Sequence, residues 1–565
     1  MTNLDFILAV CHLALLAPLA VLGLHKTWMV GLWWRRRHRT PARDDSHAQN
    51  LPRVTVQLPV YNERFVVARL IRAVAELDYP PEQLEVQVLD DSTDDTSEII
   101  AQTLAELPPG PRFHHIQRGD RTGFKAGALA TGLTSATGEF IAIFDADFLP
   151  PPGFLRAVVP HFSAPEIGLV QARWSHTNRA HSVLTQVQGL LLDGHFRIEQ
   201  RARSTNDCVF NFNGTAGLFR RQCIEDAGGW QHDTLTEDLD LSYRAQLAGW
   251  RFVYLPDLPC PAELPTDMNG FLTQQHRWAK GSIQTGRKHL GTVLRSRLPR
   301  LAKVESLFHL LGNLAFPLLL GLILVAMPLQ MVRVLSDGST RWSLTWLEEL
   351  PLLLATLSVL VYFGLSQLSL GRLTFLTLLR LPLVLSIGAG ACLNNTIAVV
   401  SALARDPGEF RRTPKNTPAN PDQRTQSYRS PRGIVPWCEV LLGSWAATTA
   451  TLAGLLGHWS TATFHGLFSL GLLWVGLQSL RSNRKLTAVL PAALLASCSG
   501  SGGSTSAPIP SGGESETVTS QAPIGKELGI RMHPDGVRVL FTQERRHGHH
   551  TYAETESPSA VDVQN

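Results

Sequence analysis

Apolar runs of membrane-spanning length lie on both sides of a long stretch of chain that has none. The first run, Phe6 to Leu24, is about as long as the apolar core of a bilayer requires. The later runs are Leu307 to Leu329, Leu350 to Leu365, Leu381 to Leu403, Val435 to Leu456 and Ala462 to Leu480. A chain with this pattern places helices in lipid and folds the intervening residues in water. We therefore predict a polytopic membrane protein.

Positive charge predicts the orientation of the first run. Asp5 precedes this run, whereas Arg35, Arg36, Arg37 and Arg39 follow it. A cleaved signal peptide has the opposite arrangement. Because Lys and Arg flanking a membrane helix stay in the cytoplasm, the residues from Arg35 onward are predicted to be cytoplasmic. We expect a multi-pass protein of a bacterial inner membrane.

The loop at 404–434 conflicts with simple alternation of the later runs. Three spans after residue 304 would place this loop outside, yet it is rich in Lys and Arg. Following the charge, we predict that the loop is cytoplasmic and that one run near 350–403 is interfacial or re-entrant. The run at 381–403 suits that role because it contains Gly388, Gly390, Asn394 and Asn395. The last two runs then form a transmembrane hairpin.

Short β-like stretches alternate with helical patterns in residues 45–300. The predicted strands are Arg53–Leu58, Leu84–Leu89, Phe140–Phe144, Ile167–Arg173 and Arg251–Leu255. The predicted helices include Asp94–Leu107, Phe124–Leu133 and Glu237–Ala248. Strands separated by helices predict a mostly parallel sheet that is covered on both faces. Ligands of such sheets bind at the carboxyl ends of the strands.

Three consecutive predicted strands end in polar or acidic groups. They are followed by Pro59-Val-Tyr-Asn-Glu63, by Asp90-Asp91 and by Asp145-Ala-Asp147. We expect these groups to meet at one edge of the sheet. The two carboxylates of the Asp-x-Asp suit a hard divalent ion, Mg²⁺ or Mn²⁺, that also binds diphosphate oxygens. Taken alone, the Asp-x-Asp is more typical of a solvated turn, and Asp90-Asp91 is typical of an ordinary turn or a helix N-cap.

The first turns of two predicted helices contain further candidate site residues. Lys125 follows a glycine and enters a helix, an arrangement that suits a phosphate. Thr236-Glu-Asp238 opens another helix. Thr236 can cap that helix and Asp238 can complement its dipole, which would explain the triplet without any catalysis. In the functional interpretation, Asp238 is a general base that accepts a proton from an acceptor hydroxyl.

The motif Gln274-Gln-His-Arg-Trp278 stands just before the second membrane run. Arg277 can hold a diphosphate through its fork of donors, and Trp278 can stack on a sugar ring. The alternative is an interfacial Arg-Trp pair at the membrane surface.

In this order, and followed by membrane helices, these motifs resemble those of processive family 2 glycosyltransferases. This group includes cellulose, hyaluronan and chitin synthases, and the resemblance is greatest to cellulose synthase-like mannan and glucomannan synthases. It covers roughly residues 50–480. The stretches that carry it are Leu89-Asp-Asp-Ser-Thr-Asp-Asp-Thr96, Gly123-Phe-Lys-Ala-Gly-Ala-Leu129, Phe144-Asp-Ala-Asp-Phe148, Phe212-Asn-Gly-Thr-Ala-Gly217 and Thr236-Glu-Asp-Leu-Asp-Leu241.

The resemblance implies an α/β GT-A (Rossmann-like) domain, an α-helical transmembrane bundle, a divalent metal and inversion at the anomeric carbon. The nucleotide-sugar would be bound by Pro59, Tyr61, Glu63, Asp90, Asp91, Lys125 and Asp145. Asp145 and Asp147 would bind the metal, and Asp238 with Glu237 would be catalytic. The acceptor and diphosphate end would be lined by Gln274, Arg277 and Trp278. A gating loop that closes over bound nucleotide would contain Phe410, Thr413 and Lys415.

The predicted organisation follows from these features. It comprises an N-terminal membrane helix with a basic flank (1–44), a cytoplasmic GT-A catalytic domain (45–300), transmembrane or interfacial helices (301–403), a gating-like loop (404–434), a transmembrane hairpin (435–480) and a polar, largely disordered tail (481–565).

We predict a metal-dependent hexosyltransferase that extends a β-glycan from a nucleotide-sugar, UDP-glucose or GDP-mannose, and moves the product outward. One alternative is a non-processive enzyme that makes a glycolipid, and another is a non-catalytic nucleotide-binding membrane protein. Expected partners are a glycan or lipid acceptor, membrane lipid and an unspecified accessory subunit. The net charge of +4 gives no reason to invoke nucleic acid. Seven cysteines without a C-x-x-C pair argue against a disulfide framework or a zinc site.

Overall fold

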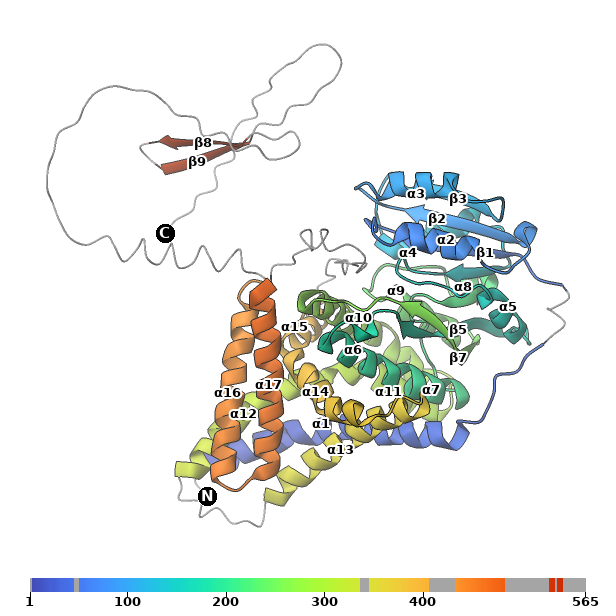
Figure 1. Cartoon of the computed structure of the whole chain (residues 1–565). Coiled ribbons are helices and arrows are strands. Elements are labelled where there is room, and N and C mark those ends of the chain that lie inside the picture. The colour runs from blue at the N-terminus through green and yellow to red at the C-terminus, as the bar shows by residue number, and fades with distance from the viewer. Residues whose placement is uncertain are drawn as a thin grey trace, which may run out of the picture. The chain divides into compact units, whose positions relative to one another are not determined.

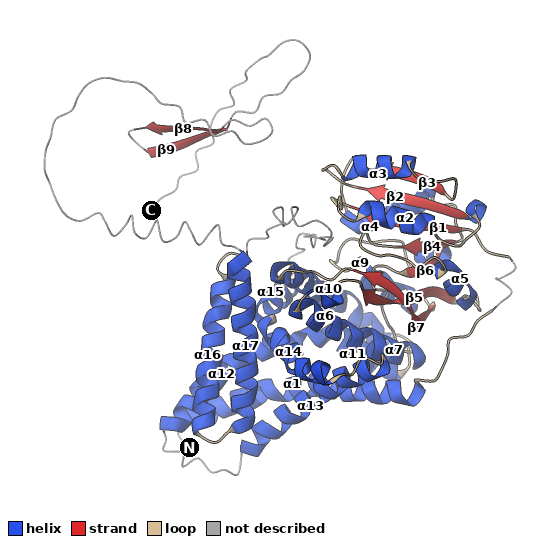
Figure 2. Cartoon of the chain, viewed as in Figure 1, coloured by secondary structure: helices blue, strands red, loops and turns tan. Residues whose placement is uncertain are grey.

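A computed structural model describes residues 3–44, 50–335, 345–405, 432–482, 528–533 and 536–541. The chain divides into two compact units, Met1–Leu490 and Pro491–Asn565. The first unit combines a β-sheet with long helices, as Figures 1 and 2 show. The predicted gating loop residues Phe410, Thr413 and Lys415 lie outside the described residues.

A seven-stranded sheet forms the centre of the α/β part, with strand order β3-β2-β1-β4-β6-β5-β7. The strands are β1 (Val54–Val60), β2 (Leu84–Asp90), β3 (Arg112–Gln117), β4 (Phe140–Ile143), β5 (Ile167–His176), β6 (Gly217–Arg220) and β7 (Arg251–Ala262). Only β6 runs antiparallel to its neighbours β4 and β5. The prediction of a mostly parallel sheet is thus confirmed, although β3 and β6 were not predicted.

Helices cover both faces of the sheet because successive strand residues point to opposite faces. Phe140 and Ala142 of β4 share a core with α2 (Val67–Ala75), α3 (Thr96–Ala105) and α5 (Phe154–Val158). Ile141 and Ile143 pack on the other face with α4 (Phe124–Ser135), α8 (Arg221–Asp226) and α9 (Glu237–Leu247). The three helices predicted in this region correspond to α3, α4 and α9.

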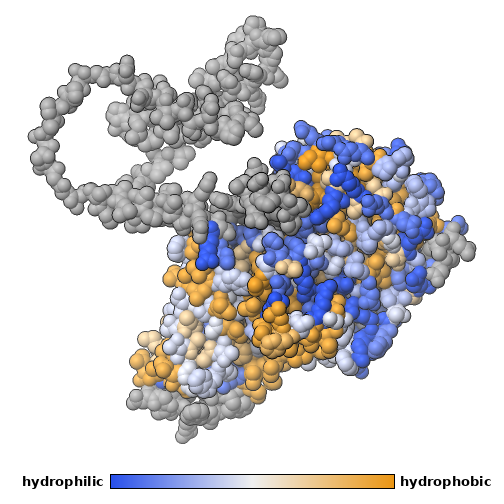
Figure 3. Space-filling view, viewed as in Figure 1, coloured by the Kyte–Doolittle hydropathy of each residue, from blue (hydrophilic) through white to orange (hydrophobic). Residues whose placement is uncertain are grey.

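Four described helical segments are long and apolar enough to cross a membrane: Leu4–Arg36, Arg300–Leu335, Leu347–Ser369 and Trp459–Arg481. They correspond to α1 (Asn3–Arg36), to α11 (Arg300–Leu311) with η6 (Gly312–Leu314) and α12 (Ala315–Leu335), to α13 (Thr345–Ser369) and to α17 (Trp459–Ser482). On the face drawn in Figure 3, apolar residues gather over the helices, and hydrophilic ones dominate the α/β part. This distribution suits helices surrounded by lipid.

The run predicted to be irregular, 381–403, is broken in the structure. Helices α14 (Phe375–Gly390) and α15 (Cys392–Leu403) meet at a bend of 44°, which makes the pair a broken span or a re-entrant loop. The predicted departure from a straight span is therefore confirmed. Counted as one span, the pair is a fifth candidate. Helix α16 (Val435–Leu455), which packs along α17, is not among the candidates, although a span was predicted there.

Asn394 anchors the broken helix pair to α10 (Met268–Arg295). Its side-chain Nδ2 donates to the carbonyl of Leu272 at 3.0 Å, and its own carbonyl accepts from His276 Nδ1 at 3.2 Å. Arg432, at the far end of the charged loop, also donates to Asn394 Oδ1 at 3.3 Å. Asn394 is buried, and these bonds supply the partners that a buried amide needs.

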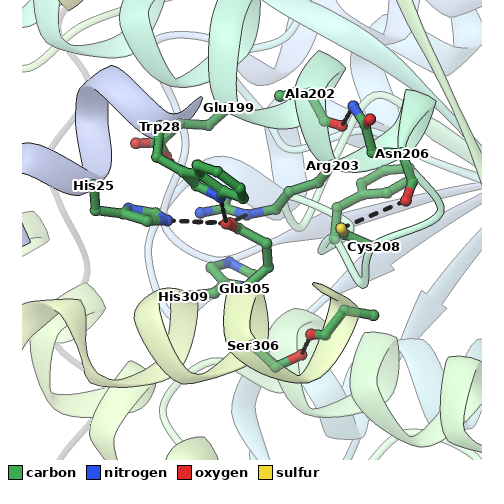
Figure 4. Close-up of polar contacts among 12 residues, drawn as sticks. His25, Trp28, Glu199, Ala202, Arg203, Asn206, Cys208, Glu305, Ser306 and His309 are labelled. Carbon is green, nitrogen blue, oxygen red and sulfur yellow. Dashed lines mark hydrogen bonds and ion pairs between the residues drawn. The ribbon is translucent and has the colours of Figure 1, made fainter. Parts of the chain in front are cut away.

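A buried polar network fixes α1 against α11 and the α/β part, as Figure 4 shows. Glu305 of α11 is fully buried and accepts from Trp28 Nε1 at 2.9 Å and from His25 Nε2 at 3.1 Å. Arg203 of α7 (Arg201–Thr205) places its Nε 3.9 Å from the same carboxylate. Because a buried carboxylate is costly without such partners, this network defines the position of α1.

The basic end of α1 contacts the α/β part directly. Arg36 and Arg39 each donate to the carbonyl of Thr205, at 2.7 Å and 3.0 Å, and Arg201 donates to the carbonyl of Arg37. The positively charged C-terminal end of α1 is therefore the end that contacts the α/β part.

The tail is described only at β8 (Leu528–His533) and β9 (Gly536–Phe541), which pair as an antiparallel hairpin.

Candidate active site

A cleft opens at the carboxyl ends of the central strands. It contains about 1250 Å³ of empty space, including its open mouth. Twelve residues singled out from the sequence line this one cleft: Pro59, Tyr61, Glu63, Asp91, Lys125, Asp145, Asp147, Glu237, Asp238, Gln274, Arg277 and Trp278. Segments more than 200 residues apart in the chain therefore meet at one place.

Asp90 is the exception among the described candidates, because it does not line the cleft. Its buried carboxylate accepts from Ser97 Oγ at 2.5 Å, from His115 Nε2 at 2.9 Å and from the backbone of Ser92 at 2.9 Å. Burial alone would raise the pKa of Asp90, but these hydrogen bonds lower it below its usual value. The predicted contact between Asp90 and the nucleotide has no support in this geometry, since the carboxylate is bound to Ser92, to Ser97 of α3 and to His115 of β3.

Asp91, the next residue, lines the cleft and is held by Arg118. Arg118 donates from Nε to Asp91 Oδ1 at 2.8 Å and from Nη2 to Asp91 Oδ2, a bidentate pair. The same guanidinium donates to the carbonyls of Thr122 and Phe124, both at 3.0 Å. Arg118 follows β3, the edge strand that was not predicted, and it ties the end of β2 to the start of α4.

A stacked pair forms another part of the wall. The guanidinium of Arg121 lies 3.3 Å from the centre of the Tyr61 ring and 4.9 Å from that of Phe124. Tyr61 and Arg121 both line the cleft. A guanidinium over an aromatic face is a favourable cation–π arrangement that presents a flat surface.

Lys125 joins three elements at the floor of the cleft. Its Nζ donates to Asp145 Oδ1 at 2.5 Å and to the carbonyl of Gly214 at 2.7 Å, and it lies 3.9 Å from Glu237 Oε1. Burial alone would lower the pKa of Lys125, but the carboxylates of Asp145 and Glu237 raise it above its usual value. The ammonium group is therefore charged at neutral pH and offsets part of the negative charge around it.

Gly214 is required at this point for two reasons. Its φ of +82° is a conformation that other residues rarely adopt, and an added Cβ would lie 3.0 Å from Asp238 Oδ2. The glycine therefore allows the backbone to approach both Lys125 and Asp238.

The carboxyl group of Asp238 has a strongly raised pKa. Burial and the adjacent Glu237 raise its pKa to about 7, against the opposing effects of Lys125, the Leu239 amide and Arg277. The backbone amide of Leu239 donates to Asp238 Oδ1 at 2.8 Å. A carboxyl group that titrates near neutral pH suits proton transfer.

The prediction that Thr236 caps α9 through its side chain is wrong. Thr236 occupies the N-cap position but makes no side-chain cap bond, and its hydroxyl lies 3.3 Å from that of Thr285 on α10. The start of α9 is instead held against α10.

Helix α10 brings the remaining candidates to the cleft. Asp267 caps it by accepting from the backbone of Gly270 at 2.9 Å, and the helix continues for 28 residues. Gln274, Arg277 and Trp278 are spaced i, i+3 and i+4, so they share one helix face, and all three line the cleft.

Asp145 and Asp147 are suitable for a divalent metal that arrives with a substrate. Among the described residues, no group of three or more His, Cys, Asp and Glu side chains is arranged to hold a metal ion. Mg²⁺ characteristically binds one or two carboxylates and takes its other ligands from water and phosphate. The Asp-x-Asp pair fits that donor set, since both residues line the cleft beside the charged Lys125.

Trp174, His176 and Asn213 also line the cleft, although the sequence patterns gave them no role. Strand β5 continues to His176, three residues beyond the predicted end. Polar groups are predicted at the ends of only three strands, and β5 is not among them. The same rule applied to β5 would have found Trp174 and His176.

Residues 52–281 match the family described as "Glycosyltransferase like family 2". The chain contains a family 2 glycosyltransferase domain. The match and the mixed seven-stranded sheet with helices on both faces confirm the predicted GT-A fold class. The long apolar helices that accompany this glycosyltransferase domain complete the predicted fold class.

The chain is also similar to curated plant proteins. The chain is 40% identical over 287 residues to glucomannan 4-beta-mannosyltransferase 2 of Arabidopsis thaliana, covering 49% of this chain and 54% of that protein. It is 44% identical over 249 residues to the probable glucomannan 4-beta-mannosyltransferase 7 of Oryza sativa subsp. japonica, covering 43% of each. These matches confirm the resemblance to cellulose synthase-like mannan synthases. The chain spans about half the length of the curated relatives that it matches.

Among solved structures, the chain is similar to a mannosyltransferase from Pyrobaculum calidifontis in complex with GDP-Man and Mn²⁺. The sequence identity is 23% and the TM-score is 0.46, with 69% of this chain and 99% of that chain covered.

Proposed function

We propose that this protein transfers a hexosyl residue from a nucleotide-sugar to a glycan acceptor. GDP-mannose is the preferred donor in this proposal, because the similar plant proteins are mannosyltransferases. UDP-glucose is the alternative donor. The observation that carries the proposal is the position of Asp238, whose pKa is about 7, in one cleft with Lys125, Asp145 and Asp147.

The nucleotide occupies the end of the cleft beside β1 and β2. Asp91, oriented by Arg118, accepts hydrogen bonds from the base or ribose, and the Tyr61–Arg121 pair provides a flat surface beside them. Arg277 carries a fork of donors that matches the diphosphate oxygens.

Asp145 and Asp147 hold the divalent ion, Mg²⁺ or Mn²⁺, together with the diphosphate. When bound, the ion supplies charge neutralisation for the departing diphosphate. Lys125 adds a fixed positive charge at the same place, because its pKa is raised by Asp145 and Glu237.

Asp238 accepts the proton from the acceptor hydroxyl. The acceptor oxygen attacks the anomeric carbon and forms the new glycosidic bond. The bond from that carbon to the diphosphate breaks, and its electron pair leaves with the nucleoside diphosphate. Because attack and departure occur on opposite faces, one displacement inverts the anomeric centre. Glu237 acts through Asp238, since its charge helps to raise the pKa of that carboxyl group.

The cleft faces the cytoplasm in this proposal. The basic end of α1 contacts the α/β part through Arg36 and Arg39, and positive residues next to membrane helices mark the cytoplasmic side. The domain organisation predicted above, including a gating role for Phe410, Thr413 and Lys415, is part of the same proposal.

A growing polymer that leaves across the membrane is the preferred product. Helix α10 supports this choice, because it lines the cleft with Trp278 and contacts the broken pair α14–α15 through His276 and Asn394. A chain that leaves the cleft therefore meets membrane helices. A glycolipid made without processive transfer is the alternative.

The test is transfer of radiolabelled sugar by the purified protein in liposomes. GDP-mannose, UDP-glucose, UDP-galactose and UDP-N-acetylglucosamine are compared with Mg²⁺ and Mn²⁺, alongside Asp238→Asn. We expect label from GDP-mannose in a long polymer that mannanase digests, and none with the variant. Label confined to organic-extractable lipid would support the glycolipid instead. Nucleotide binding without transfer from any donor to any added acceptor would contradict the enzyme assignment.

A further inference from the structure

Three residues of the cleft wall carry buried nitrogens with no hydrogen-bond partner among the described residues. These nitrogens are Trp174 Nε1, both ring nitrogens of His176 and Asn213 Nδ2. Buried polar atoms in proteins are paired in the great majority of cases, because an unpaired one loses its hydration without compensation. Several such atoms in one substrate cleft indicate groups whose partners are supplied by the ligand.

The orientation of Asn213 is fixed by its neighbours. Its Oδ1 accepts from Gln200 Nε2 at 3.1 Å and from Asn211 Nδ2 at 3.1 Å. Its backbone amide donates to Gln171 Oε1 at 3.2 Å. Since the side-chain oxygen is already taken by two donors, the NH₂ group is the part of this amide that remains available to a ligand.

Trp174 is held in place by two aromatic rings. Its ring lies 5.1 Å from that of Phe148 and 5.1 Å from that of Phe196, measured between ring centres. Such packing fixes the plane of the indole, so its N–H keeps one direction.

His176 is neutral at physiological pH, because burial lowers its pKa to about 4. A neutral imidazole offers one donor and one acceptor nitrogen. That combination matches a hydroxyl group, which can both donate and accept. Trp174, His176 and Asn213 together therefore present donors and one acceptor without a net charge.

The sheet order places this set on the side of the cleft away from the nucleotide. Trp174 and His176 belong to β5, which is four strands from β2 and Asp91 in the order β2-β1-β4-β6-β5. At about 4.8 Å per step, this corresponds to roughly 19 Å across the sheet. Asp145, at the end of β4, lies between them. A nucleotide beside β2 and a diphosphate at Asp145 would leave a sugar next to β5.

We infer that Trp174, His176 and Asn213 form a sugar-recognition subsite that binds the hydroxyl groups of a hexose. The inference rests on the proposed function for its substrate. The hexose is either the sugar of the donor or the terminal sugar of the acceptor, and both present the same hydroxyl chemistry. Sites built to bind a sugar hydroxyl discriminate strongly against ligands that lack it. The subsite is thus expected to determine which sugar is used.

The experiment compares His176→Phe and Trp174→Phe, which remove nitrogens but keep flat rings, with the wild-type protein in liposomes. Trp230→Phe is the matched control. Its Nε1 is also buried without a partner among the described residues, but Trp230 belongs to the core and does not line the cleft. The measurements are KM for GDP-mannose, KM for mannotetraose as acceptor, and Kd for GDP.

We expect each cleft variant to raise one of the two KM values by about tenfold, because it loses one hydrogen bond to the sugar. Kd for GDP should stay within about twofold, and Trp230→Phe should resemble the wild type. A higher KM for mannotetraose alone places the acceptor sugar at the subsite, and a higher KM for GDP-mannose alone places the donor sugar there. Unchanged KM values for both would overturn the inference.

Direct binding measurements separate failure of this inference from failure of the proposed function. If the wild type binds GDP but transfers no sugar, the enzyme assignment fails and binding of mannotetraose and GDP-mannose is measured directly by calorimetry. Weaker binding of either sugar ligand to His176→Phe, with unchanged binding of GDP, would still support the subsite. Equal binding of every ligand by both proteins would refute it.

Discussion

The Nζ atom of Lys125 lies 2.5 Å from Oδ1 of Asp145. The same ammonium group partly offsets the rise in the pKa of Asp238 that burial and Glu237 cause. One lysine therefore interacts with both halves of the candidate site, the Asp-x-Asp pair and the proposed base Asp238. Its third partner is the carbonyl of Gly214, at 2.7 Å. The charge state of Asp238 and the position of Asp145 are thus linked through one side chain.

Asp238→Asn should reduce the rate of sugar transfer by about 10²- to 10⁴-fold, the usual effect of losing a general base. Kd for GDP should change little, because Asp238 lies at the sugar end of the cleft in the proposed arrangement. Transfer assays and calorimetry provide the two measurements. Glu225→Gln is the control, since Glu225 is an exposed carboxylate paired with Arg221 on α8. Full activity in Asp238→Asn would remove it as the base.

The rate of transfer should depend on pH with an apparent pKa of about 7. Asp238 acts as a base only when ionised, and its pKa is raised to about 7. Lowering the pH through 7 protonates it, so kcat/KM should fall about tenfold per unit at lower pH. The check is a pH–rate profile between pH 5 and 9. A profile that is flat down to pH 5 would show that another group accepts the proton.

Lys125→Met should shift the acidic side of the pH–rate profile, where kcat/KM falls, to higher pH. Removing the ammonium group takes away a charge that lowers the pKa of Asp238, so the base should need a higher pH to ionise. The rate on the alkaline plateau should fall as well, because Asp145 loses a hydrogen bond at 2.5 Å. An acid limb at an unchanged pH would mean that Lys125 and the base are not coupled.

Arg118→Ala should destabilise the protein by about 3 kcal/mol, because it leaves the carboxylate of Asp91 without its bidentate partner in a nearly buried site. Arg72→Ala is the matched control. Arg72 pairs with Glu106, and both side chains are about half exposed. Loss of this ion pair should therefore lower the free energy of unfolding by less than about 1 kcal/mol. Denaturant unfolding in detergent measures both changes. Arg118→Ala should also bind GDP more weakly than the wild-type protein.

Removal of divalent ions should abolish transfer, and added Mn²⁺ or Mg²⁺ should restore it. Asp147→Asn should need roughly tenfold more metal for half-maximal activity, because one of two carboxylate ligands becomes a neutral amide. The measurement is a metal titration of transfer after treatment with a chelator. Activity that is insensitive to the chelator in both proteins would exclude the proposed metal at Asp145 and Asp147.

Periodicity located most of the fold, and its failures have physical reasons. Strands β1, β2, β4, β5 and β7 lie where buried apolar runs predict them. Strand β3 has the sequence Arg-Phe-His-His-Ile-Gln and lies at the sheet edge, where partial exposure removes the apolar pattern. Strand β6 is four residues long and antiparallel, too short for a periodic signal.

The candidate site was predicted from residue types at strand ends and helix starts, and that rule identifies which segments reach the cleft. It does not identify which side chain faces it. Asp90 and Asp91 are adjacent and identical in chemistry, yet Asp91 lines the cleft and Asp90 binds Ser97 and His115. Adjacent residues at the end of a strand face opposite ways, and the sequence does not show where the strand ends.

The amino-acid sequence was sufficient to predict most of the long apolar helices, the covered sheet and the acidic and basic groups at its edge. These are properties of local pattern and composition. The three-dimensional fold was needed to find that the pKa of Asp238 is raised to about 7, because this pKa depends on burial and on the charges of Glu237, Lys125 and Arg277. It was also needed to find the unpaired nitrogens of Trp174, His176 and Asn213. Burial, distance and hydrogen-bond pairing are set by residues far apart in the chain, and no local pattern contains them.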